Sequence, residues 1–169
     1  LYFSEIKKKG IFIEIGACDG VQFSNTFKLE QYGWNGIICE PSPYWLKKMK
    51  SRNCIISKKA VFNESGLKLK FEDVEKSPDL SGLSDNFEKD ANSNLRQNTK
   101  ITEVETITLN DLIEINIPNK KIDYISIDTE GSEYEIIKNF NFNKFEVEIF
   151  TIEHNFIEKK RDDTLKLMT

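Results

Sequence analysis

The chain has 169 residues, of which 38% are hydrophobic and 31% are charged, and it carries a net charge of −4 with a pI near 5.2. This length can bury the core of one domain. An acidic balance disfavours nucleic-acid binding, which usually needs a basic surface, and no run approaches the roughly 20 apolar residues that cross a bilayer. We therefore expect one globular domain over residues 1–169, with no nucleic acid and no membrane span.

The first third of the chain predicts alternating strands and helices. A β-rich run at 11–15 ends in a glycine turn, and Ser24-Asn25 is suited to cap a helix over 26–32. The apolar run at 36–39 predicts a second, buried strand. Further on, Ser42 suits an N-cap and Pro43 the first helical position, and the apolar pairs 55–56 and 60–61 predict a third strand region.

Residues 72–105 differ from their surroundings in charge, with more than twice as many acidic as basic residues. Their apolar side chains, among them Leu80, Leu83 and Phe87, are too few to build a core of their own. We interpret this acidic segment as a long lid-like insertion that covers the site and selects the substrate.

The second half returns to the alternating pattern. Asn110 is suited to cap a helix, the run 122–127 predicts a strand, and Ser132 with Glu135 forms a capping-box pattern. A further strand is expected over 145–153. Strands that alternate with helices, without adjacent hairpins, predict an α/β fold with a mostly parallel central sheet and helices on both faces.

Acidic and polar residues follow the predicted strands. They include Glu14 and Gly16 in the first turn, Glu40 after the second strand, Asp128 after the fourth and His154 after the last. In open parallel sheets, ligands bind beyond the carboxyl ends of the strands. The sequence therefore predicts a ligand site where these strand ends meet.

The first turn has the pattern Glu14-x-Gly16-x-x-x-Gly20, which is neither the dinucleotide fingerprint nor a phosphate-binding P-loop. Its glycines let the backbone approach a ligand closely. Twenty residues further on, the Glu40 carboxylate can accept both hydroxyl protons of a ribose. Ribose recognition without pyrophosphate recognition indicates a nucleoside ligand, of which S-adenosylmethionine is the common one.

Four stretches carry a family resemblance: 10–27 with IEIGACDG, 33–44 with IICEPSP, 122–138 with SIDTEGSEYE, and TIEHN at 151–155. In this order they resemble the FkbM-type family of methyltransferases. The resemblance implies a Rossmann-like class I fold, S-adenosylmethionine as cofactor, and mostly O-methylation of hydroxyls on sugars, glycolipids or other small molecules. Methyltransferases of this class usually add two further strands, so the chain is expected to lack its last strands after the helix predicted at 161–168.

The resemblance and the strand-end pattern together predict a cofactor site. Its expected residues are Glu14, Gly16, Ala17, Asp19, Gly20, Ser24, Asn25, Glu40, Pro41, Ala60, Val61 and Asp128. The helix start at Ser24-Asn25 suits the methionine carboxylate, although it is equally compatible with a plain N-cap. Asp19 and Asp128 suit the ammonium group, although Asp19 also suits closure of the glycine turn. Ala60-Val61 falls where adenine usually binds.

The expected catalytic residues are His154, Asp128 and Glu130. A neutral alcohol is a poor nucleophile, so a base near the methyl group helps. His154 is the only histidine and follows a strand end, next to Glu153. The carboxylates of Asp128, Glu130 and Glu153 would also suit a divalent metal such as Mg²⁺. We do not favour this interpretation, and the predicted site contains no metal.

The cysteines and the first residue bear on cellular context. Cys18, Cys39 and Cys54 lie in or beside apolar runs without metal-ligand spacing, which is typical of a reducing compartment and of a cytoplasmic protein. The chain begins with Leu rather than Met, as expected of a start trimmed or cut from a longer chain.

Other functions stay open at this stage. The same fold can serve as a non-catalytic cofactor-binding or carbohydrate-binding module. A nucleic-acid methyltransferase would normally show a basic element or an N-P-P-Y-like motif, and a nicotinamide oxidoreductase would show a tighter glycine turn. The sequence shows none of these three signals.

Overall fold

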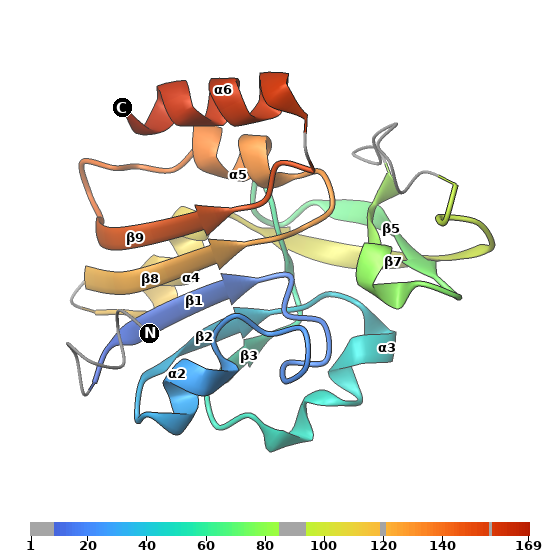
Figure 1. The fold of residues 1–169 in the computed structure, drawn as a ribbon, viewed down its shortest axis with the longest axis horizontal. Coiled ribbons are helices and arrows are strands. Elements are labelled where there is room, and N and C mark those ends of the chain that lie inside the picture. The colour runs from blue at the N-terminus through green and yellow to red at the C-terminus, as the bar shows by residue number, and fades with distance from the viewer. Residues whose placement is uncertain (1–8, 85–93, 119–120, 156) are drawn as a thin grey trace.

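The computed structural model describes residues 9–84, 94–118, 121–155 and 157–169. Its central sheet has the strand order β3-β2-β1-β8-β9, and every neighbouring pair is parallel. Figure 1 shows this sheet with its arrowheads on one side. The strands are β1 (Ile11–Ile15), β2 (Asn35–Cys39), β3 (Ile55–Ser57), β8 (Lys121–Ile127) and β9 (Glu146–Ile152). The predicted α/β fold with a parallel sheet is therefore confirmed.

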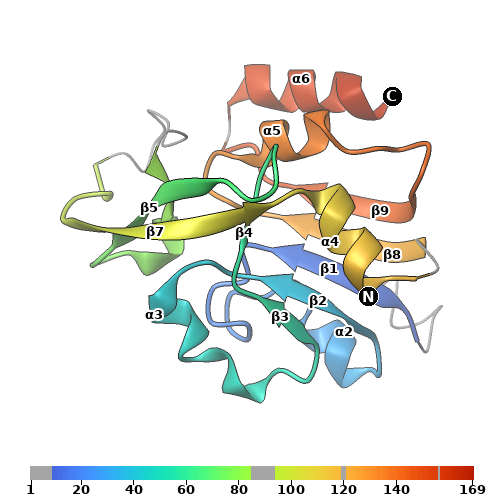
Figure 2. The same ribbon diagram turned by 180° about the vertical axis from the view of Figure 1, so that it is seen from behind.

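Helices cover both faces of the sheet, as Figures 1 and 2 show from opposite sides. On one face, α4 and α5 contribute to the larger hydrophobic cluster, and on the other, apolar residues of α2 and α3 pack against a second cluster. The helices are α2 (Phe27–Gln31), α3 (Pro43–Leu46), α4 (Leu109–Asn116), α5 (Glu133–Lys138) and α6 (Glu158–Met168), with 3-10 turns at Met49–Ser51 and Pro78–Leu80. No helix in the described ranges is long and apolar enough to cross a membrane.

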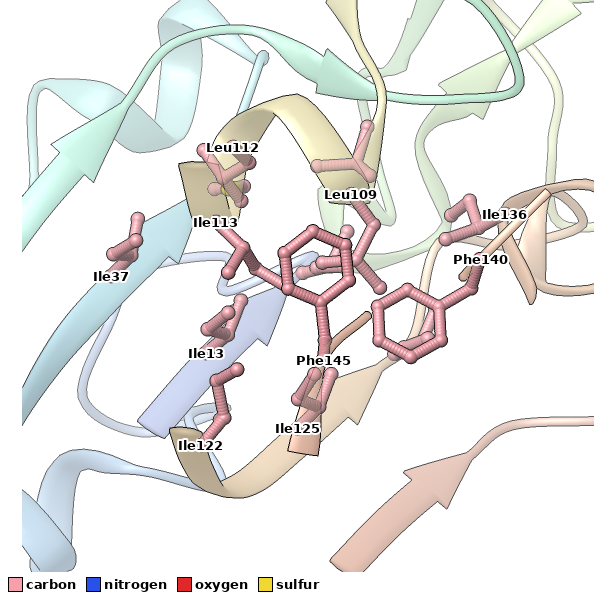
Figure 3. Close-up of a cluster of buried hydrophobic side chains, with 14 of the residues drawn as sticks. Ile13, Ile37, Leu109, Leu112, Ile113, Ile122, Ile125, Ile136, Phe140 and Phe145 are labelled. Atoms are coloured by element: carbon pink, nitrogen blue, oxygen red, sulfur yellow. The ribbon is translucent and has the colours of Figure 1, made fainter. Parts of the chain in front are cut away.

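The two clusters follow from the alternation of side chains along the strands. Ile13 and Ile37 belong to the larger cluster, whereas Phe12 and Ile38 belong to the cluster on the opposite face. Figure 3 shows Ile13 and Ile37 lying below the apolar residues of α4. Because both faces are covered, these strands are apolar at successive positions, which is typical of a buried parallel sheet.

A second, smaller sheet lies beyond the carboxyl ends of the parallel strands (Figures 1 and 2). Its order is β4-β7-β5-β6, and β5 pairs antiparallel with both β6 and β7. It is formed by β4 (Ala60–Val61), β5 (Lys68–Val74), β6 (Gly82–Leu83) and β7 (Thr99–Ile107). The single third strand region expected at 55–61 is wrong, because β3 and β4 lie in different sheets.

The acidic segment 72–105 supplies much of this second sheet, while Phe87 lies outside the described residues. Leu83 and Val104 of the segment pack with Ala60 and Phe71, which precede it, in a small buried cluster. The sequence analysis did not predict the antiparallel pairs of this second sheet. In β5, polar and apolar residues alternate from Lys68 to Glu72, a strand signal that the analysis missed, whereas the alternation in β7 is weak.

Two helix caps differ from the prediction. The cap of α4 is Thr108, whose hydroxyl accepts from Asp111 N at 3.1 Å, whereas the Asn110 amide donates to Asn139 O. At α5, Ser132 occupies the N-cap position without a side-chain capping bond, so the predicted capping box is wrong. The carboxylate of Glu133 instead accepts from backbone N–H groups of the preceding turn. The cap at Ser42 is confirmed by its bond from Tyr44 N.

Helix α4 offers a matched test of the core. Ile113 is fully buried, while Ile115 in the same helix is 72% exposed. We expect Ile113→Ala to lower the free energy of unfolding by about 2–5 kcal/mol, because it leaves a cavity under the helix. Ile115→Ala should change it by less than about 0.5 kcal/mol in the same denaturant titration. Equal effects of the two substitutions would contradict this packing.

Candidate functional site

A cavity lies where the order of the central sheet reverses, between β1 and β8. Its free space, counted out to the open mouth and including solvent there, is about 510 Å³. Its floor is formed by the turns that follow β1, β2 and β8, and its other wall includes Phe71 and Leu83 of the second sheet. Carboxyl ends of parallel strands at a reversal of strand order are the expected place for a ligand.

Some of the residues predicted to bind a cofactor line this cavity and others do not. Those that line it are Gly16, Glu40, Pro41, Ala60, Val61 and Asp128. Those outside its lining are Glu14, Ala17, Asp19, Gly20, Ser24 and Asn25. The structure therefore divides the predicted set into a cavity group and a group that surrounds the first turn.

Gly16 lies in the floor of the cavity, where the ends of three strands approach one another. It has φ +82°, and a Cβ atom there would lie 1.6 Å from the carbonyl oxygen of Asp128. Gly16 N donates to Cys39 O at 3.0 Å, and Asp128 N donates to Ile15 O at 2.9 Å. Only glycine combines this left-handed conformation with so close a backbone contact, so the ends of β1, β2 and β8 meet at this residue.

The Glu14 carboxylate secures the loop that precedes α2. It is 1% exposed and accepts from Ser24 Oγ at 2.6 Å, Asn25 N at 2.5 Å and Thr26 Oγ1 at 2.7 Å. Burial raises the pKa of Glu14, and these donors together with the nearby Arg52 guanidinium oppose that rise. The network thus joins β1 to the helix start.

Asp19 closes the first turn. Its Oδ1 accepts from the backbone N–H groups of Val21 at 2.9 Å, Gln22 at 2.8 Å and Phe23 at 3.3 Å. Gly20, with φ +72°, follows in the same turn, and its carbonyl accepts from Arg52 Nη1 at 2.7 Å. Asp19 and Gly20 therefore shape the loop from outside the cavity lining.

Glu40 is a buried carboxyl group in the cavity wall. Its Oε2 accepts from Cys18 N at 2.9 Å, and its Oε1 accepts from Ser42 N at 2.8 Å. Burial raises the pKa of Glu40 to about 8, against the opposing effect of these two hydrogen bonds. Each oxygen keeps further acceptor capacity, so the ionised group can still accept two hydroxyl protons of a ligand.

Three carboxyl groups converge beyond β8 and β9. Oxygens of Asp128, Glu130 and Glu153 lie within 4.8 Å of one another, an arrangement that could hold a hard divalent cation. Burial raises the pKa of both Asp128 and Glu153, and the hydrogen bond and charge of Asp128 raise that of Glu153 further, to about 9. Burial also raises the pKa of Glu130 to about 7, which its partner Arg96 opposes.

His154 follows β9 and is half-buried, but it is not part of the cavity lining in the described chain. Its carbonyl accepts from Ile157 N at 2.8 Å at the start of α6. Asp128 and Glu130, by contrast, both line the cavity. Among the predicted catalytic residues, these two are therefore the ones that the structure brings to the cavity.

Sequence reasoning missed one wall of the site. Trp45 of α3 lines the cavity, and its Nε1 donates to Pro78 O at 3.0 Å. Ser81 and Leu83 also line it, although both lie in the acidic segment. A tryptophan soon after Glu40-Pro41 is a local signal that could have been noticed, and so is the alternation of polar and apolar residues around Phe71 in β5.

Comparison with known proteins agrees with this architecture. The strand order and the cavity at its reversal define a Rossmann-like α/β protein. A family model, the methyltransferase FkbM domain, matches residues 14–169, so the chain belongs to the FkbM methyltransferase family, whose activity is S-adenosylmethionine-dependent methyl transfer. No curated protein and no solved structure matches the chain.

Two glycines with the same φ test the close contact at Gly16. Gly66 also has φ +82°, but a Cβ atom there would meet nothing within 4 Å. We expect Gly66→Ala to cost about 1–2 kcal/mol of unfolding free energy, from backbone conformation alone. Gly16→Ala should cost clearly more, because the methyl group displaces the Asp128 backbone. A denaturant titration that gave equal costs would refute the contact.

Proposed function

We propose that the chain transfers a methyl group from S-adenosylmethionine to a hydroxyl oxygen of a sugar, a glycolipid or another small molecule. The observation that carries the proposal is one cavity lined both by a buried carboxyl group, that of Glu40, and by Asp128, whose carboxyl group lies within 4.8 Å of that of Glu153. The first suits a ribose, and the second can take a proton from an alcohol.

The residues of the cavity fit the cofactor. Glu40 would accept the ribose hydroxyl protons, and the apolar surface at Ala60 and Val61 suits the adenine ring. Gly16 leaves room for close approach of the ligand to the backbone. When bound, S-adenosylmethionine supplies a methyl group that is already activated by its sulfonium centre.

The chain must then orient the acceptor and remove its proton. Asp128 lines the cavity and is more exposed than Glu153, so it is the member of the pair that can reach an acceptor hydroxyl. We infer that Asp128 is the base and that Glu153 keeps it oriented. His154 and Glu130 remain further candidates for this role, and a divalent cation held by the three carboxyl groups remains the less favoured reading.

The charge of the surroundings favours a neutral acceptor. Asp79 and Glu130 line the same cavity as Asp128, so an anionic acceptor would be repelled at its mouth. Neutral polyols such as sugars can instead donate hydroxyl protons to several of these carboxyl oxygens.

Activity assays of three variants test the base. S-adenosylhomocysteine release would be followed with a panel of sugars, glycolipids and hydroxylated small molecules. For an acceptor that is methylated, we expect Asp128→Asn to lower kcat by about 10²–10⁴-fold while the affinity for S-adenosylhomocysteine is retained. His154→Ala should have a smaller effect. If Asp128 instead binds the ammonium group, Asp128→Asn weakens cofactor affinity, and a larger loss with His154→Ala would move the base to that residue.

A protein that binds S-adenosylhomocysteine but methylates no acceptor in the panel would favour the non-catalytic binding module. The non-catalytic module stays an alternative because Glu40 and the apolar surface at Ala60 and Val61 could bind the cofactor without any methyl transfer. Failure to bind S-adenosylhomocysteine at millimolar concentration would contradict the cofactor site altogether.

The raised pKa of Glu40 predicts a pH-dependent affinity. Only the ionised carboxyl group can accept both ribose protons, so the affinity for S-adenosylhomocysteine should fall by about tenfold per pH unit below pH 8. Above pH 8, the affinity should level off. Isothermal titration calorimetry between pH 6 and 9 checks this, with Glu40→Gln as the control, for which we expect weaker binding that lacks this slope. An identical slope in both proteins would contradict the role of Glu40.

A further inference from the structure

Arg96 connects two walls of the cavity. It lies in the acidic segment shortly before β7, and its side chain is 4% exposed. Its Nη2 donates to Glu130 Oε2 at 2.7 Å, and its Nε donates to Leu80 O at 3.3 Å. Glu130 lies in the floor of the cavity beyond β8, whereas Leu80 belongs to the chain that forms the opposite wall.

That opposite wall contains residues 78–83, which we name the roof segment. Pro78, Asp79, Ser81 and Leu83 of the roof segment line the cavity. One of its edges is tied to α3 through the bond from Trp45 Nε1 to Pro78 O. Its other end pairs with β5, since Leu83 is the partner of Phe71 in the antiparallel ladder. Neither tie reaches the floor beyond β8, which is where Arg96 makes its ion pair.

Arg96 is suited to this position by its shape and charge. The planar guanidinium can donate in two directions at once, which the ammonium of lysine cannot do with the same geometry. Glu130 has φ +57° and is 8% exposed, so its carboxylate sits in a strained turn away from bulk water. A buried carboxylate without a cation is costly, and Arg96 therefore stabilises both the turn and the roof segment above it.

We propose that Arg96 is a positioning residue that fastens the roof segment over the cofactor cavity and thereby slows the departure of the cofactor. The proposal rests on the cofactor assignment made above. It deepens that assignment, because it makes the acidic segment part of the cofactor pocket rather than only a selector of the acceptor. Arg96 acts through Leu80 and Glu130 and needs no contact with the reacting atoms.

The first test measures the dissociation rate of S-adenosylhomocysteine by stopped-flow displacement. We expect Arg96→Met to raise the rate by about tenfold, with little change in the association rate. Arg96→Lys keeps the positive charge but loses the guanidinium that donates in two directions, so its dissociation rate should lie between those of wild type and Arg96→Met. In a Glu130→Gln background, Arg96→Met should add much less than tenfold, since the two side chains act through one contact.

The second test needs no cofactor. Cys18 lines the cavity, while Cys54 is half-buried outside its lining. If the roof segment covers the cavity, Arg96→Met should speed alkylation of Cys18 by iodoacetamide several-fold and leave Cys54 unchanged, as measured by peptide mass spectrometry. Loss of the positive charge of Arg96 would make a nearby thiol less acidic and its alkylation slower, so faster alkylation of Cys18 reports access rather than acidity.

Controls separate fastening from simple loss of stability. Ile122→Val, at the amino end of β8 and away from the cavity, lowers stability without touching the roof segment, and it should leave both rates unchanged. Should Arg96→Met fail to fold, Arg96→Lys and the double variant Arg96→Met/Glu130→Gln, which leaves no unpaired charge, carry both measurements.

The outcomes are distinct. Unchanged dissociation and unchanged Cys18 alkylation in folded Arg96 variants overturn the proposal while the cofactor site stands. Effects of Arg96→Met that are equally large with Glu130→Gln overturn the fastening through Glu130. Absence of S-adenosylhomocysteine binding in the wild-type chain refutes the cofactor assignment and with it the effect on dissociation, whereas faster Cys18 alkylation would still show that Arg96 holds the roof segment.

Discussion

The site depends on the contact between the backbones of Gly16 and Asp128. The turn after β1 and the turn after β8 approach so closely that a single methyl group would fill the space between them. This approach lets the end of β2, with Cys39 and Glu40, meet the same point. The turns that line the cavity are thus positioned by main-chain atoms, which are stiffer than side chains.

Around that contact, buried charge is arranged in separate groups. Arg52 neutralises the network of Glu14 on the α2 face of the sheet, and Arg96 neutralises Glu130 at the cavity. Glu40 has no such cationic partner among its leading contacts, and burial raises its pKa. Glu14 and Glu130 are thus paired with arginine, whereas Glu40, for which we propose a ribose, is left able to change its protonation when a ligand binds.

The sequence predicted the central sheet well, because a buried parallel strand has a strong apolar signal and each strand end carried polar residues. The strand-end pattern and the family resemblance together also placed Gly16, Glu40 and Asp128 at one site, and all three line the cavity. The sequence could not separate Glu14 from Glu40, since both are acids near strand ends. Glu14 lies within β1, where its side chain faces α2, whereas Glu40 follows β2 and reaches the cavity. Only the register of the strands distinguishes them.

The second sheet was beyond sequence reasoning for a different reason. Its residues gain their burial by packing against each other across long separations, as Leu83 does with Ala60. In β5, charged residues such as Lys68 and Lys70 alternate with apolar ones, but the charge of this region was interpreted as a lid rather than as the exposed side of a strand. The cap of α4 was misassigned because several polar residues lie within one turn of the helix start, and only the geometry selects among them. At α5 the predicted N-cap residue, Ser132, is correct, and only the predicted capping box is wrong.

The position of β1 between β2 and β8 also constrains how the chain can fold. Ile13 pairs with Ile37 nearby in sequence but with Ile125 across more than half of the chain. Closing so long a loop costs entropy before the contact stabilises anything, so this pairing is slow by nature. During synthesis, the turn at Gly16 would leave the ribosome long before its partner at Asp128, and the cavity can form only after most of the chain has been made. Mutations that weaken the pairing of β1 with β8 should therefore lower the yield of folded protein.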